Sequence, residues 1–244
     1  MAQMRNVCVM VAALALAAVP RASAQAPSPS MSKYFASVNI GGQLASRTYS
    51  TVLAQTVYDE TATLNASLPV GNGLVTDFGG GYKVWDNVFV GFSISLFSDS
   101  DNLNYSASIP DPLVTDRLRT TTGSLADQKH FETAYLPSII YTRALTDKID
   151  LIGGIGPAII HLSQDTITGF TVPAGTQDVN VTSAKDSGTG TGINVSVGAN
   201  YNVTPRYAVG GYVRYAGAKV ELESSPDKVD VGGAQIGVGV RVNF

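Results

Sequence analysis

"GAQIGVGVRVNF", residues 233–244, ends the sequence with a clean alternation of apolar and small or polar residues. The apolar positions are Ala234, Ile236, Val238, Val240, Val242 and Phe244. A period of two is typical of a β-strand, whose side chains point alternately to opposite faces of the sheet. The intervening residues are mostly too small for an ordinary solvent-facing surface, and they are Gln235, Gly237, Gly239, Arg241 and Asn243.

The same alternation recurs in "YFASVNIGGQ" (34–43), "VFVGFSISLFS" (88–98) and "INVSVGANYNV" (193–203). Less regular segments are "LVTDFGGGYKVW" (74–85), "FETAYLPSIIYT" (131–142), "IDLIGGIGPAIIHL" (149–162) and "YAVGGYVRY" (207–215). Together these predict eight strands. Short links at "WDN", "RALTDK" and "VTPR" carry turn-forming residues. The four longer links are roughly residues 44–73, 99–129, 163–191 and 222–230, and stretches such as "TVYDETATLN" are expected to extend them as hairpins.

The composition decides which face of these strands points inward. Only 14% of the residues are charged, well below the usual quarter for soluble domains. In a soluble barrel the apolar face forms the core, which would leave a solvent surface with few Lys or Glu residues. In a membrane barrel the apolar face meets lipid and small polar residues fill the lumen. We therefore predict an all-β fold, an eight-stranded antiparallel up-and-down transmembrane β-barrel closed by its first and last strands.

Aromatic residues give a second, independent indication. They gather beside the short turns and chain ends, at Tyr34, Tyr82, Tyr141, Tyr201, Tyr207 and Phe244, while Phe131, Tyr135 and Tyr215 lie toward the long links. Ten residues separate Phe131 from Tyr141, about 26 Å along the membrane normal for a tilted strand. That length matches the apolar band of an outer-membrane barrel. Short turns and both termini are then expected on the periplasmic side.

The N-terminal segment reads as an export signal. Arg5 precedes the 13-residue apolar run "VCVMVAALALAAV", and Ala22 and Ala24 flank Ser23 in a small-x-small cleavage site. The run is too short for a spanning helix. We predict a signal peptide at 1–24, a flexible linker at 25–32 and a barrel at 33–244. The remaining chain carries 14 basic and 19 acidic residues and no cysteine, because Cys8 lies in the signal, and nothing in it indicates nucleic-acid binding.

The segments "GGGYKVWDNVFVGFSIS", "LTDKIDLIGGIGPAI" and "GVGVRVNF" resemble the small eight-stranded outer-membrane barrels of Gram-negative bacteria, the OmpA-transmembrane-domain, OmpW and opacity-protein-like group. The resemblance covers about residues 33–244. It implies that a terminal aromatic residue with alternating apolar residues before it is read by the outer-membrane assembly machinery. The matching positions here are Ile236, Val238, Val240, Val242 and Phe244.

The strand phases place six charged side chains in the lumen. Asp77, Glu132 and Arg214 are expected toward the outside, and Lys83, Asp150 and Arg241 toward the periplasm. Charges inside a narrow barrel must pair, because an unpaired buried charge is costly. We expect an ion-paired, filled lumen, with a gated narrow pore as the alternative.

The sequence offers few residues for catalysis, metal binding or phosphate binding. His161 and Ser163 share a strand face and resemble the His-x-Ser pair of the outer-membrane lipid A deacylase, but about 7 Å separates such side chains and Gln164 departs from the expected Asn. With two histidines and no further cysteine, neither a metal site nor a cofactor is expected. The glycine-rich "GGGY" and "GTGTG" lack the setting of a phosphate loop.

These observations lead to a functional expectation. The chain is predicted to be a monomeric, non-enzymatic protein of the cell outer membrane, in contact with its lipid and its assembly machinery. Its role is expected to be structural or surface-interactive, in membrane integrity, adhesion or defence against host factors, and not that of a general porin. One alternative is a narrow or lateral conduit for small or apolar molecules, and a second is a lipid A-modifying hydrolase.

Overall fold

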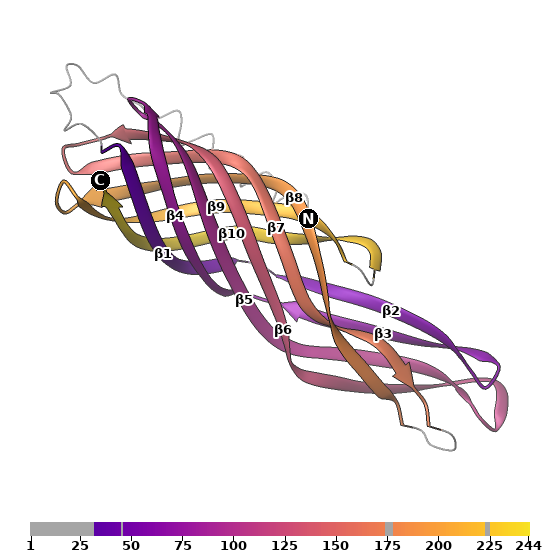
Figure 1. Ribbon diagram of the computed structural model, residues 1–244. Coiled ribbons are helices and arrows are strands. Elements are labelled where there is room, and N and C mark those ends of the chain that lie inside the picture. The colour runs from indigo at the N-terminus through magenta and orange to yellow at the C-terminus, as the bar shows by residue number, and fades with distance from the viewer. Residues whose placement is uncertain (1–31, 45, 174–177, 223–224) are drawn as a thin grey trace, which may run out of the picture. The chain divides into compact units, whose positions relative to one another are not determined.

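The computed structural model describes residues 32–44, 46–173, 178–222 and 225–244. The predicted signal peptide and nearly all of the predicted linker lie outside these residues. No helix in the described part is long and apolar enough to cross a membrane. The ten strands, shown in Figure 1, are β1 (Tyr34–Leu44), β2 (Arg47–Val57), β3 (Glu60–Val70), β4 (Gly73–Trp85), β5 (Val88–Asp111), β6 (Val114–Ala144), β7 (Ile149–Thr171), β8 (Asn180–Asn202), β9 (Tyr207–Leu222) and β10 (Ser225–Asn243).

Eight of these strands form a closed antiparallel ring in the order β1, β4, β5, β6, β7, β8, β9 and β10. The first and last strands pair from Phe35 with Asn243 to Leu44 with Ala234, so the predicted closure is confirmed. The remaining predicted pairs follow the chain, through tight turns at residues 86–87, 145–148 and 203–206. The prediction of an eight-stranded up-and-down barrel is therefore confirmed.

The link expected at residues 44–73 contains a separate hairpin, β2–β3, that is not part of the ring. Its strands pair with each other along their full length, and residues 63–67 of β3 pair with residues 104–108 of β5. Strands β5 and β6 also continue well past the ring, to a turn between Asp111 and Val114. Figure 1 shows β2, β3, β5 and β6 running together away from the chain's C-terminal end. The expected hairpin extensions are therefore present.

The wall of the ring has its apolar side chains on the outside. Val238 is 63% exposed, Phe92 49% and Val195 41%, whereas Arg241 and Asn200 on the opposite face are partly buried. The period-two pattern therefore sorts the residues as predicted. A surface of this composition fits contact with acyl chains and not with water.

The expectation of a polar lumen is wrong for much of the interior. Two buried apolar clusters fill the end of the structure that carries the long hairpins. One cluster lies under the β2–β3 hairpin and contains Leu64, Leu68, Phe97 and Ile109. The other lies inside the ring and contains Leu136, Ile160, Leu162, Val220 and several alanines. In "IDLIGGIGPAIIHL" both faces are apolar because one meets lipid and the other packs across the lumen.

The opposite end carries aromatic side chains near the start of β1 and the end of β10. The Tyr34 and Tyr82 ring centroids lie 5.2 Å apart, and the backbones of Tyr34 and Phe244 exchange hydrogen bonds. Lys33 Nζ lies 5.8 and 5.4 Å from the Tyr34 and Tyr82 centroids, and Arg206 Cζ lies 5.6 Å from that of Phe244. Cations held over aromatic faces suit the level of lipid headgroups.

Candidate functional site in the barrel interior

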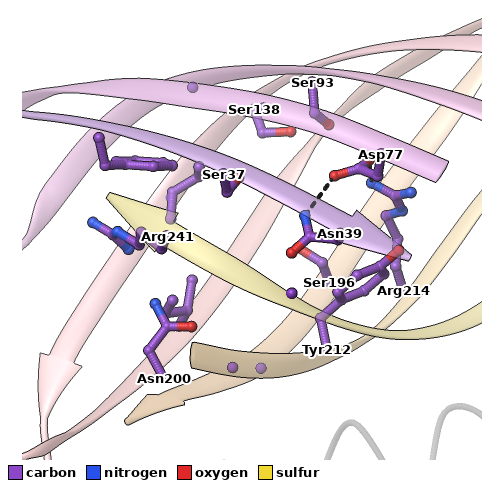
Figure 2. A pocket seen from close by; sticks show the side chains of 18 of the residues that line it. Ser37, Asn39, Asp77, Ser93, Ser138, Ser196, Asn200, Tyr212, Arg214 and Arg241 are labelled. Carbon is purple, nitrogen blue, oxygen red and sulfur yellow. Dashed lines mark hydrogen bonds and ion pairs between the residues drawn. The ribbon is translucent and has the colours of Figure 1, made fainter. Parts of the chain in front are cut away.

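Arg214 is the centre of a buried polar network that crosses the lumen. It extends from β9, and only 6% of the residue is exposed. Its guanidinium donates to Asp77 Oδ2 on β4 at 2.7 Å, to Gln235 Oε1 on β10 at 2.8 Å and to Ser95 Oγ on β5 at 3.0 Å. Asn39 on β1 donates to the other Asp77 oxygen at 2.9 Å, as Figure 2 shows. The planar, forked guanidinium can donate hydrogen bonds to three strands of the barrel at once.

The network continues toward the long hairpins through two glutamines. Gln235 Nε2 donates to Gln43 Oε1 at 2.7 Å, and Gln43 Nε2 donates to Glu132 Oε2 at 3.3 Å. His130 Nε2 lies 2.9 Å from Glu132 Oε1, and His130 Nδ1 lies 3.2 Å from Gln164 Oε1. All of these side chains are less than 5% exposed. We call this connected set the interior polar network, and it consists of Asn39, Gln43, Asp77, Ser95, His130, Glu132, Gln164, Arg214 and Gln235.

Glu132 also connects the network to the point where strands β1 and β10 stop pairing. Beyond Leu44 and Ala234, strands β1 and β10 no longer pair, and the backbone nitrogen of Gly232, at φ +80°, donates to Glu132 at 2.9 Å. Arg47 Nη1 lies 3.7 Å from Glu132 and donates to the Asp230 carbonyl at 2.8 Å.

Tyr49 reinforces the same junction from β2. Its hydroxyl donates to the Asp230 carbonyl at 2.9 Å, and its ring stacks on His130 with centroids 5.1 Å apart. Burial raises the pKa of the Tyr49 phenol to about 12, so the hydroxyl remains a donor at any physiological pH. The backbone ladder between β1 and β10 ends at Leu44 and Ala234. Beyond that point, side chains of β2 contact β10 in its place.

On the other side of Arg214, toward the start of β1 and the end of β10, the lumen holds a small cavity of about 140 Å³ with both polar and apolar lining residues. Figure 2 shows its lining, which includes Ser37, Asn39, Ser138, Ser196 and Tyr212. A cavity with this many polar groups has room and partners for ordered water. The cavity is bounded at one end by the Asp77–Arg214 ion pair.

Arg241 bounds the cavity on the side of the start of β1 and the end of β10. Its guanidinium lies 3.9 Å from the Phe35 centroid, and its Nε donates to Asn243 at 2.9 Å. Asp150 accepts a hydrogen bond of 2.8 Å from Asn202, and Lys83 is partly buried. The six charged residues singled out from the sequence thus occupy two levels. Asp77, Glu132 and Arg214 belong to the interior polar network, whereas Lys83, Asp150 and Arg241 lie nearer the turns.

Several members of this site were not singled out from the sequence. Gln43 and Gln235 fall on the polar faces of their predicted strands, where the sequence gives them no role. Arg47 and Tyr49 lie in the link expected at residues 44–73, and His130 lies between the link expected at 99–129 and the strand predicted from residue 131. The signal that could have found the glutamines is their size. Within "SVNIGGQ" of β1 and "QIGVGV" of β10, each glutamine is the longest side chain on an inward face that otherwise holds only Ser, Asn and Gly.

His161 and Ser163 do not form a pair in this structure. His161 is exposed on the outer face, and its Nδ1 lies 3.0 Å from Thr189 Oγ1 on β8, whereas Ser163 is partly buried. The imidazole therefore contacts the neighbouring strand instead of the serine. Across residues 32–44, 46–173, 178–222 and 225–244, no group of three or more His, Cys, Asp or Glu side chains could hold a metal ion.

The interior polar network holds its buried charged and polar groups in contact with one another. Its acids and bases are hydrogen-bonded to one another, and the lumen above it is packed with apolar side chains. Buried pairs of this kind fix the relative positions of the strands that carry them, because removing either partner leaves a costly unpaired charge.

Comparison with known proteins shows a family match and similar solved structures. The sequence profile of the family described as "Outer membrane protein beta-barrel domain" matches residues 10–244. No curated protein matches significantly in sequence. Similar solved structures include Neisserial surface protein A, with 15% identity, a TM-score of 0.43 and coverage of 86% of this chain and 96% of that chain. OprG from Pseudomonas aeruginosa has 13% identity, a TM-score of 0.48 and coverage of 89% and 98%.

Proposed function

The chain belongs to the outer membrane protein beta-barrel domain family, and from that premise we propose that it acts as a filled barrel with a structural or surface-interactive role. It is a protein of the outer membrane. The observation that carries the proposal is the interior polar network, in which Arg214 bridges β4, β5 and β10 across the lumen. The apolar clusters beyond it reinforce the closure.

The contents of the lumen support a role other than that of a general porin. A wide aqueous channel needs a continuous polar path, as in barrels of sixteen or more strands. Here the ring has eight strands, and the side chains of Leu136, Ile160, Leu162 and Val220 are no more than 1% exposed. Below the interior polar network, toward the start of β1 and the end of β10, the lumen holds a cavity of just about 140 Å³.

Conductance in planar lipid bilayers tests this proposal. We expect purified, refolded protein to give small or no conductance, close to that of a protein-free bilayer. A sixteen-stranded porin inserted by the same procedure is the positive control, because its lumen is open. Large, steady, porin-like currents from the refolded protein would refute a filled lumen.

A second candidate is a conduit for small apolar molecules. The apolar clusters favour it, because their side chains would give an apolar solute an apolar environment inside the structure if their packing loosened. Uptake of a labelled apolar solute into liposomes that contain the protein distinguishes the two roles. The filled barrel predicts uptake equal to that of protein-free liposomes, and the conduit predicts faster uptake.

We also propose an oligomeric state and two partners for the protein. It acts as a monomer, it contacts outer-membrane lipid through its apolar wall, and it is inserted by the outer-membrane assembly machinery. The alternating residues Ile236, Val238 and Val240, each more than half exposed on the outer face of β10, support the last of these. Changing Phe244 to Ala tests it, since slower insertion is expected in cells, with unchanged stability of the folded fraction.

A further inference from the structure

The outer face of the long hairpins carries a regular array of small polar side chains. The strand registers align residues of β2, β3, β5 and β6 in three rows, which are Ser50–Ser67–Asn104–Ser124, Val52–Asn65–Ser106–Thr122 and Ala54–Thr63–Ser108–Thr120. Ten of these twelve positions hold Ser, Thr or Asn. We call this surface the hydroxyl array.

The array faces away from the apolar interior. Its neighbours along β3 and β5, including Leu64, Ala66 and Ala107, are fully or almost fully buried in the apolar cluster beneath. Because side chains alternate along a strand, the array residues must point outward. Asn65, Asn104 and Thr122 are indeed exposed. The array is therefore a free surface of the described part of the chain.

The array is hollowed and carries no charge. A shallow depression of about 640 Å³ runs across β2, β3, β5 and β6, and none of the residues that line it is charged. A phosphate or sulfate group would call for Arg or Lys, and an apolar ligand for an apolar lining. Closely spaced hydroxyl and amide groups that both donate and accept are matched instead to a neutral, polyhydroxylated molecule.

The position of the array indicates which molecule of this kind it meets. Two of its strands, β5 and β6, continue directly from the lipid-facing wall, where Phe92 and Tyr135 stack on their outer surface. Ser124 lies seven residues beyond Phe131, roughly 18 Å further from the apolar band for a tilted strand. In an outer membrane this level is occupied by the sugars of the surrounding lipopolysaccharide.

We propose that the hydroxyl array is a docking surface for the saccharide part of outer-leaflet lipopolysaccharide. The proposal deepens the surface-interactive role proposed above and rests on it. Side chains of Asn65, Ser106 and Thr122 would supply hydrogen bonds at the centre of the depression, and the neighbouring rows would extend the contact along a sugar chain. The contact selects hydroxyl groups and not the phosphates of lipid A.

The test uses the full mature chain refolded in phospholipid nanodiscs that lack lipopolysaccharide. Dephosphorylated core oligosaccharide is titrated in, and amide chemical shifts are followed by NMR. We expect saturable shifts confined to residues that line the depression. Changing Ser106 to Ala together with Thr122 to Val removes two central hydroxyls while keeping size and strand propensity, and should weaken binding about tenfold.

The matched control changes Thr182 to Val and Ser183 to Ala, two exposed positions on β8 outside the depression. The control should bind like the unchanged protein, and circular dichroism should show that both variants fold. The proposal is overturned if the oligosaccharide causes no shifts at millimolar concentration, or if both variants lose affinity equally. Shifts that depend on protein concentration without sugar would assign the array to a second copy of the chain. None of these outcomes changes the conductance expected of a filled lumen.

Discussion

Replacing Arg214 with Met would remove the cation at the centre of the lumen while keeping a side chain of similar length. Asp77 would then keep only its 2.9 Å hydrogen bond from Asn39, and Ser95 would lose its 3.0 Å donor. Breaking a buried ion pair by removing one partner costs about 3–5 kcal/mol, because the other charge stays buried and uncompensated. We expect a loss of that size in the free energy of unfolding.

A second substitution separates charge burial from simple loss of contacts. Changing Asp77 to Leu in the Arg214→Met background removes the stranded carboxylate. Buried ion pairs replaced on both sides by apolar residues are often neutral in stability. The double variant should therefore recover at least half of the lost free energy. Changing Lys228 to Met, which breaks an exposed ion pair of 2.8 Å with Glu221, should cost less than about 1 kcal/mol.

The assay is equilibrium unfolding in urea of protein refolded into lipid vesicles, with the free energy obtained by linear extrapolation. The reasoning fails if Arg214→Met costs no more than the exposed Lys228→Met control. It also fails if the double variant is less stable than Arg214→Met alone, since the carboxylate would then not be the source of the penalty.

Three further perturbations test other parts of the structure. Gly190→Val should prevent refolding, because a Cβ there would collide with a backbone oxygen of β9. Gly153→Ala should refold normally, since the space around Gly153 is open. The folded fraction after refolding measures both effects. Val195→Lys on the lipid face should cost about 2–4 kcal/mol in urea unfolding, and Val203→Lys in a turn about 0–1. Tyr49→Phe should cost about 1 kcal/mol, since it removes the hydrogen bond to Asp230, and an unchanged midpoint would show that this bond does not hold the wall closed.

The strands of the ring, and the side chains of each that face outward, follow from the sequence because they depend on local alternation. In β6, the phase set by Phe131, Tyr135 and Ile139 places all three outside and Glu132 inside, and the structure agrees. A one-residue error would have moved every side chain to the other face. Apolar residues at alternate positions therefore fixed which charges enter the lumen.

Which charges meet across the lumen could not be predicted. Asp77 and Arg214 are 137 residues apart in the chain and lie on non-adjacent strands. Their contact depends on the stagger of every strand pair between them, since the stagger determines the height of each residue on the barrel axis. The alternation of a single strand carries no information on that height.

The β2–β3 hairpin was only partly predictable, for a local reason. Its two-residue turn is Tyr58–Asp59, with φ angles of 53° and 62°. Such turns usually contain Asn or Gly, which tolerate positive φ, so a Tyr at the first position gives no turn signal. The docking of β3 on β5 is a tertiary contact, and it buries Leu64 and Leu68 against Phe97 in one apolar cluster.

The central claim is that apolar side chains face lipid and inward side chains fill the lumen, and site-directed spin labelling tests it most directly. The only cysteine, Cys8, lies in the predicted signal, so single cysteines can be placed at residues 193–197 of β8 in the mature chain. We predict high collision rates with membrane-dissolved oxygen at residues 193, 195 and 197, and low rates with both oxygen and a water-soluble nickel complex at 194 and 196. High nickel accessibility at 194 and 196 would reveal a water-filled lumen, and oxygen accessibility with the opposite phase would contradict the account.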